Sequence, residues 1–136
     1  MISNIHVWYK IQMSGSFSIA IIDDEEHIRR ALSRLLNSVG MNTRSYASAQ
    51  EFLAFYKNRY PDCVIVDLQM RNFNGFELVT CLRQLGVKLP IIMITAYDDP
   101  SMREKCISAG VDAYLYKPLD DQVLLDAISD VCESHH

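Results

Sequence analysis

The amino-acid sequence predicts an α/β fold in which a doubly wound, parallel sheet of five strands is covered by five helices. Five short apolar runs alternate with five helical stretches along the chain. Consecutive strands joined by a helix are almost always parallel, with a right-handed crossover. The chain has 136 residues, 49% of them hydrophobic and 22% charged. That length and composition suit one globular domain with a substantial core.

The predicted strands are too short to be helices and are rich in Ile, Val and Tyr, which favour strands. They cover residues 17–22, 42–46, 63–66, 91–94 and 113–116. The first strand has no polar side between Ile19 and Ile22. This is typical of a central parallel strand with helices on both of its faces.

The predicted helices have apolar residues at helical spacing and recognisable ends. The first has a buried face made of Ile28, Ala31, Leu32, Leu35, Leu36 and Val39, and it ends at Gly40. A capping box, Ser48 to Glu51, opens the second, which buries Phe52, Leu53 and Tyr56. The third spans 75–85 before Gly86, and the fourth spans 101–109 before Gly110. The fifth begins at Asp120 and buries Val123, Leu124, Ala127, Ile128 and Val131.

The two ends of the chain differ from this regular pattern. Residues 1–16 are expected to be a leader, an upstream extension or a cloning remnant, although Trp8 would also suit an extra edge strand. The domain proper is expected to span 17–134, and 135–136 to be a tag remnant.

Composition excludes several functions. A net charge of −4 argues against direct nucleic-acid binding. No apolar run is long enough to span a membrane, and there is no signal-peptide pattern. The four cysteines have no metal-ligand spacing and are expected to be small hydrophobic residues in a reducing compartment. We therefore expect a soluble, cytoplasmic protein.

Polar residues gather where the predicted strands end. Asp23 and Asp24 follow the first strand, Asp67 the third, Thr95 ends the fourth and Lys117 follows the fifth. In such a sheet the binding crevice lies at the carboxyl ends of the strands. Three neighbouring carboxylates repel one another unless a cation shares the site, and an all-oxygen set suits Mg²⁺.

A lysine and a hydroxyl beside these carboxylates are the groups expected around a phosphoryl group. No Ser or Cys nucleophile stands at this edge, so a carboxylate is the expected attacking group, as in aspartyl-phosphate chemistry. The sequence therefore predicts an aspartate that accepts a phosphoryl group.

The motifs resemble the receiver domain of two-component response regulators over about residues 17–133. The matching segments are Ile21-Ile22-Asp23-Asp24-Glu25, Val64 to Met70 with Gly75 eight positions after Asp67, Ile92 to Ala96, and Ala109 to Pro118. The resemblance implies a flavodoxin-like sheet in the order 2-1-3-4-5. It also implies a phosphorylation switch, part of a phosphorelay, rather than a turnover enzyme.

The resemblance also implies a role for each site residue. Asp67 would be the phosphoacceptor. Asp23, Asp24, Asp67 and the backbone carbonyl of Gln69 would hold Mg²⁺, with Asp23 acting mainly through water. Thr95 would bind the phosphoryl group, Lys117 would pair with it in front of a cis Pro118, and Tyr114 would turn inward as Thr95 moves. The side chains of Gln69 and Tyr97 would tune the access of water.

The resemblance implies partners as well. These are a sensor histidine kinase or phosphotransfer protein, and an output domain or downstream protein that reads the surface of the fourth helix, fifth strand and fifth helix. Homodimer formation on phosphorylation stays open. Residues 48–53 further resemble receivers that precede a LuxR-type helix-turn-helix domain. No such domain is expected within residues 1–136, so the chain is expected to be either a receiver cut from a longer regulator or a stand-alone receiver.

Two functions other than a phosphorylation switch fit parts of the sequence. A degenerate receiver would act only as an interaction module, but the complete set of site residues argues against it. An aspartate-nucleophile phosphohydrolase would need a second carboxylate at the position of Gln69.

Some positions have simpler interpretations. Asp24 alone could cap the first helix, and Glu25 and Glu26 suit a helix N-terminus. Arg71 stands where the family often has proline, which predicts either a more mobile loop or a partner contact there. Phe73 in the same loop is expected to pack locally.

Overall fold

The computed structural model describes residues 17–134, and the expectations for 1–16 and 135–136 lie outside this range. A single parallel sheet has the order β2-β1-β3-β4-β5, which confirms the predicted fold and strand order. The strands are β1 (Ser18–Ile22), β2 (Asn42–Tyr46), β3 (Cys63–Asp67), β4 (Ile91–Thr95) and β5 (Ala113–Tyr116). The helices are α2 (Glu26–Ser38), α3 (Ala49–Phe55), α4 (Gly75–Gln84), α5 (Pro100–Ala109) and α6 (Asp121–Ser134), with a short 3₁₀ helix, η1 (Tyr56–Arg59).

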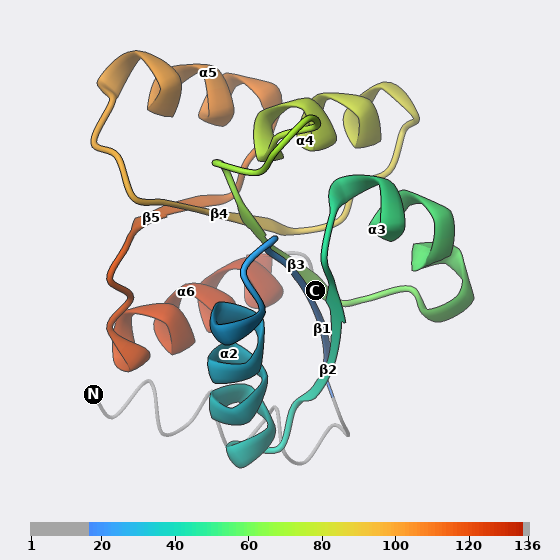
Figure 1. Cartoon of the computed structure of the whole chain (residues 1–136), viewed down its shortest axis with the longest axis vertical. Coiled ribbons are helices and arrows are strands. Elements are labelled where there is room, and N and C mark those ends of the chain that lie inside the picture. Colours follow the sequence, from blue (N-terminus) through green and yellow to red (C-terminus); the bar gives the residue numbers. More distant parts are fainter. Residues whose placement is uncertain (1–16, 135–136) are drawn as a thin grey trace.

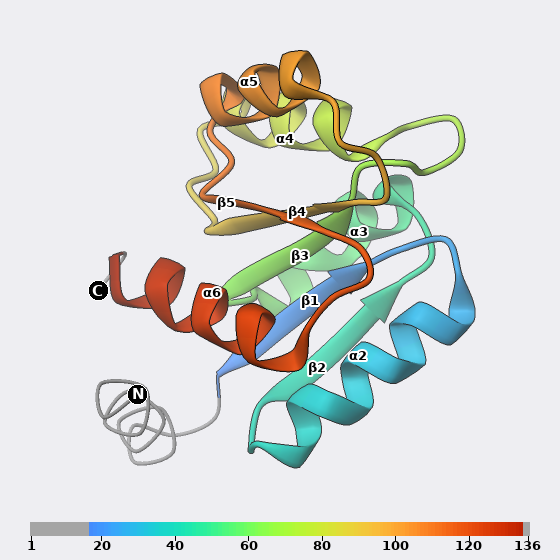
Figure 2. The same cartoon turned by 90° about the vertical axis from the view of Figure 1, so that its left-hand side faces the viewer.

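The helices form a layer on each face of the sheet. Helices α2 and α6 cover one face, and α3, α4 and α5 cover the other (Figures 1 and 2). Strand β1 shows why both faces are apolar. Ile19 and Ile21 belong to the core against α2 and α6, whereas Ala20 and Ile22 belong to the core on the opposite face. Because successive side chains of a strand alternate between faces, a sheet covered twice needs a continuous apolar run.

Side-chain caps set the starts of several helices. The Ser48 hydroxyl accepts the N–H of Glu51 at 3.1 Å, as the predicted cap requires. Asp99 caps α5, and Asp120 accepts the N–H of Val123 at the start of α6. At α4, Asn74 forms a full capping box: its side chain accepts the N–H of Glu77, and the Glu77 side chain accepts the N–H of Asn74.

Two expected core residues are exposed. Ala31 of α2 lies on the solvent side, and the Val123 side chain in α6 is 48% exposed. In α6 the buried face is turned toward Leu125 and Cys132, which pack in the core beside Leu124 and Ile128. The direction in which a helix faces its sheet is set by packing, so a residue at the margin of an apolar stripe falls on either side.

The cysteines are all free, and Cys63, Cys106 and Cys132 are buried, as expected for small hydrophobic residues. Within residues 17–134, no helix is long and apolar enough to cross a membrane.

Candidate functional site

Carboxylates at the ends of two neighbouring strands meet at the carboxyl edge of the sheet. Oxygens of Asp23, Asp24, Glu25 and Asp67 all lie within 4.8 Å of one another. Asp67 is the last residue of β3, and Asp23 and Asp24 follow β1, its neighbour in the sheet. Asp23 and Asp67 are buried. The structure thus brings the predicted carboxylates together, and it adds Glu25, which the sequence suggested only as a helix-terminal charge.

Lys117 supplies the positive charge at this site. Its Nζ atom donates to Asp67 Oδ2 at 3.0 Å and to Asp23 Oδ2 at 3.4 Å. The N–H of Lys117 bonds the carbonyl of Thr95 at 2.7 Å, and the Lys117–Pro118 peptide is cis, as predicted. Burial lowers the pKa of Lys117, but its hydrogen bonds and charge interactions with Asp67 and Asp23 outweigh burial and leave the pKa raised.

The negative charge around Asp67 exceeds what Lys117 compensates. Burial and the charge of Asp23 raise the pKa of Asp67 to about 6, although Lys117 and the N–H of Gln69 oppose the rise. Four carboxylates lie within 4.8 Å of one another, and the ammonium group of Lys117 bonds two of them, Asp23 and Asp67. Hard oxygen donors with uncompensated negative charge are what Mg²⁺ prefers, so these residues fit a divalent cation.

The side chain of Gln69 links Asp67's loop to the end of β4. Its backbone N–H donates to Asp67 Oδ1 at 3.0 Å, and its Nε2 donates to Thr95 Oγ1 at 2.6 Å. Its Oε1 accepts the N–H of Ala96 at 3.1 Å. The resemblance to receiver domains implies a metal-binding carbonyl and a role in water access for Gln69. The contact between its carboxamide and buried Thr95 was missed, because residues 26 positions apart carry no local signal of pairing.

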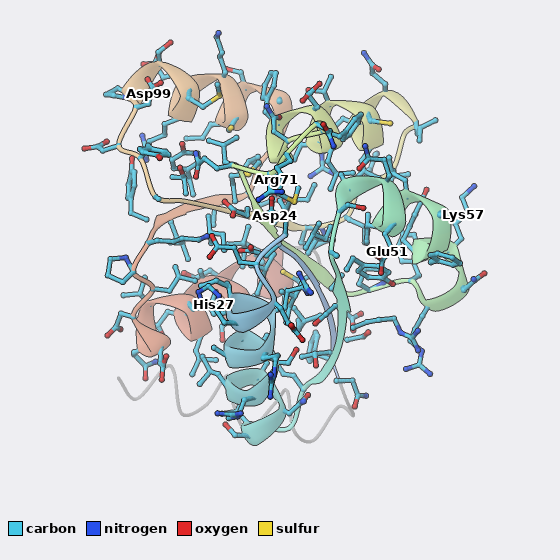
Figure 3. The ribbon with its side chains drawn as sticks, in the orientation of Figure 1. Asp24, His27, Glu51, Lys57, Arg71 and Asp99 are labelled. Carbon is cyan, nitrogen blue, oxygen red and sulfur yellow. The ribbon has the colours of Figure 1, made fainter. Side chains whose placement is uncertain are left out.

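Asp24 does not cap the first helix. The N-cap residue of α2 is Glu25, and Oδ2 of Asp24 instead accepts the N–H of Arg71 at 3.3 Å. Figure 3 shows Asp24 and Arg71 next to each other. In the same loop, Phe73 is partly buried against the core, which confirms that it packs locally.

Tyr114, the predicted switch residue, lies inside the molecule with 9% of its surface exposed. Its ring packs edge-on against Tyr116, with ring centres 5.6 Å apart. Its hydroxyl is buried and makes no hydrogen bond of ordinary length among residues 17–134. Burial is the main reason that the pKa of Tyr114 is raised, and a weaker interaction of the hydroxyl with the Thr95 side chain opposes the rise.

The unpartnered hydroxyl makes Tyr114→Phe an informative variant. Removing a buried polar group that has no partner removes its desolvation cost, so we expect an unchanged or higher free energy of unfolding, by up to about 1 kcal/mol. Chemical denaturation of the two proteins measures the difference. A loss above about 1 kcal/mol would show that the hydroxyl has a hydrogen-bond partner.

The amino-acid sequence is similar to those of known proteins. Residues 19–129 match the model of the response regulator receiver domain family. The chain is 37% identical over 112 residues to the transcriptional regulatory protein TdiR of Thauera aromatica, covering 82% of this chain and 49% of that protein. It is 32% identical over 117 residues to the transcriptional regulatory protein FixJ of Rhizobium meliloti, covering 86% of this chain and 57% of that protein. The chain thus spans about half the length of these curated relatives.

Solved structures of response regulator proteins have a fold similar to that of this chain. The crystal structure of FixJ-N superposes with a TM-score of 0.80 at 32% identity, covering 87% of this chain and 94% of that one. A response regulator receiver protein from Burkholderia phymatum gives a TM-score of 0.77 at 38% identity, covering 87% and 96% of the two chains. With its parallel sheet in the order 2-1-3-4-5 and its acidic edge beside a lysine, this chain belongs to the response regulator receiver domain family, the signal-receiving module of two-component systems.

Proposed function

We propose that this chain is a switch that is activated when Asp67 accepts a phosphoryl group from a phosphohistidine of a sensor histidine kinase or phosphotransfer protein. The observation that carries the proposal is the buried carboxylate of Asp67, which lies among further carboxylates and 3.0 Å from the ammonium of Lys117. A carboxylate oxygen of Asp67 would form a bond to phosphorus as the N–P bond of the donor breaks. The electron pair would stay on the donor imidazole.

The other site residues would hold the charge of the transferred group. Lys117 would pair with a phosphoryl oxygen and Thr95 would donate its hydroxyl to another. Asp23, Asp24, Asp67 and the backbone carbonyl of Gln69 would hold Mg²⁺, Asp23 mainly through water. When bound, the ion would neutralise charge between the carboxylates and the incoming phosphoryl group.

The contacts of the Gln69 side chain support a change between two conformations at the end of β4. Its carboxamide is bonded to the hydroxyl of Thr95 and the N–H of Ala96. Phosphorylation that recruits Thr95 would break the 2.6 Å contact with Gln69. The end of β4 and the start of α5 would then repack together with β5 and α6, with Tyr114 as the switch residue. An output domain or a downstream protein would read this surface, and a homodimer could form through it.

Other aspects of the proposal concern the whole protein. We propose that residues 17–134 form one receiver domain that works in the cytoplasm. It would assist its own phosphorylation and dephosphorylation but would not turn over an external substrate. The aspartate-nucleophile phosphohydrolase is disfavoured because position 69 carries Gln, whose amide nitrogen is bonded to Thr95, in place of an acid.

Intact mass spectrometry tests the proposal. After incubation with a small phosphodonor and Mg²⁺, we expect one added phosphoryl group on the wild type. Asp67→Ala and an EDTA-treated sample should show none. Incorporation that persists in Asp67→Ala would place the acceptor elsewhere, and no incorporation with any donor or divalent ion would favour the interaction module that works without phosphorylation.

A further inference from the structure

Arg71 differs from the proline that receivers often have at this position, and the structure shows what the difference allows. Its backbone N–H donates to Oδ2 of Asp24 at 3.3 Å, across 47 positions of sequence. Proline has no N–H, so this hydrogen bond exists only because position 71 is not proline. Arg71 and Asp24 lie beside each other where the loop after β3 meets the loop after β1 (Figure 3).

The conformation of the β3–α4 loop directs this N–H. The N–H of Phe73 bonds the carbonyl of Arg71 at 2.7 Å, and Asn72 between them has a φ of +66°. Asn is one of the few residues that adopt this left-handed conformation readily. The loop is anchored before α4 by the capping box of Asn74 and Glu77. It is therefore a turn held by hydrogen bonds at both of its ends.

Asp24 lies in a strongly acidic environment. Its oxygen lies within 4.8 Å of those of Asp23, Glu25 and Asp67, and like charges at this separation repel one another. Asp23 and Asp67 are held by Lys117 and by backbone N–H groups. Within residues 17–134, the Asp24 carboxylate accepts its hydrogen bond from the N–H of Arg71.

We propose that Arg71 is a positioning residue for the metal site, because its N–H holds the Asp24 carboxylate within the acidic cluster while a carboxylate lone pair stays free for Mg²⁺. This inference rests on the proposed function, which supplies the ion. A carboxylate offers about four lone-pair directions, so one N–H leaves room for a cation. Partners that orient metal ligands typically change metal affinity by about 10-fold or more when they are lost.

The test compares Arg71→Pro, which lacks the N–H, with Arg71→Ala, which keeps it and loses the guanidinium. Isothermal titration calorimetry measures the Kd for Mg²⁺ without any phosphodonor. We expect Arg71→Pro to bind Mg²⁺ about tenfold more weakly than the wild type. Arg71→Ala should bind as tightly as the wild type or slightly more tightly, because a nearby positive charge is removed. Equal affinity of wild type and Arg71→Pro, or equal weakening in both variants, overturns the inference.

A double-mutant cycle separates this role from a general disturbance of the loop. If the N–H acts through Asp24, then Arg71→Pro should not weaken Mg²⁺ binding further in an Asp24→Ala background. An equal loss in both backgrounds would mean that proline distorts the site as a whole, and the inference would be wrong.

Hydrogen exchange of the Arg71 amide, followed by NMR, provides a measurement that does not change residue 71 and holds even if Arg71→Pro fails to fold. Exchange should be faster in Asp24→Ala than in the wild type, and an unchanged rate would contradict the hydrogen bond. The two proposals fail differently. A wild type that binds no Mg²⁺ overturns both, whereas a wild type that binds Mg²⁺ only as tightly as Arg71→Pro overturns the role of Arg71 alone.

Discussion

In the absence of divalent cations, Asp67→Asn is expected to be more stable than the wild type at neutral pH. Folding raises the pKa of Asp67 from 3.8 to about 6 because of burial and the charge of Asp23. Below pH ~4 the carboxyl is protonated in both states and contributes no difference. Between about pH 4 and 6 the unfolded chain loses this proton first, so the free energy of unfolding falls as the pH rises, by up to about 3 kcal/mol. Above pH ~6 the loss is complete.

The asparagine side chain in Asp67→Asn keeps the shape of the aspartate but carries no charge to bury. It has one oxygen acceptor in place of the two that serve Gln69 and Lys117, and this loss lowers the free energy of unfolding by the same amount at every pH. Urea denaturation of both proteins in EDTA, from about pH 4 to 8, should therefore show the advantage of Asp67→Asn grow up to about pH 6 and then level off. Mg²⁺ should stabilise the wild type more than Asp67→Asn, because ligand binding stabilises the folded state that holds it. A wild type that gains stability relative to Asp67→Asn over this pH range would contradict the raised pKa.

Gly75→Ala is expected to lower the free energy of unfolding by about 2 to 4 kcal/mol. A Cβ atom at this position would lie 2.7 Å from the backbone oxygen of Asp67, 2.7 Å from Met93 Sδ and 3.0 Å from Leu68 Cα. The methionine side chain can move away, but the backbone of Asp67 and Leu68 cannot shift without moving the proposed phosphorylation site. The variant should therefore lose both stability and phosphoryl incorporation.

Gly86→Ala is the matched control for this variant. A Cβ there meets nothing within 4 Å, so the only cost is the positive φ of +77°. We expect a loss of about 1 kcal/mol and full phosphoryl incorporation. Denaturation curves and intact masses of the two variants check both points. Equal losses in the two variants would show that the close approach of Gly75 to β3 is not what matters.

The architecture and the set of residues that reach the site could be predicted from the amino-acid sequence. The apolar runs of β1 and β3, the caps at Ser48 and Asp120, and the stop at Gly110 are local signals, and the structure agrees with them. Chain order in a parallel sheet brings the carboxyl ends of the strands to one edge, so the meeting of Asp67 with Lys117 follows from the alternation of strands and helices.

The pairing of the groups at this edge could not be predicted from the sequence, because it depends on how the loops fold against one another. The contact of Gln69 with Thr95 and that of Arg71 with Asp24 join separate loops. The second depends on a left-handed turn at Asn72, which no periodicity reveals. The exposure of Val123 was likewise settled by how α6 packs on the sheet. Hydrophobic patterns specify which face of an element is buried, but loop conformation and packing angles place individual donors and acceptors, and these depend on the whole folded chain.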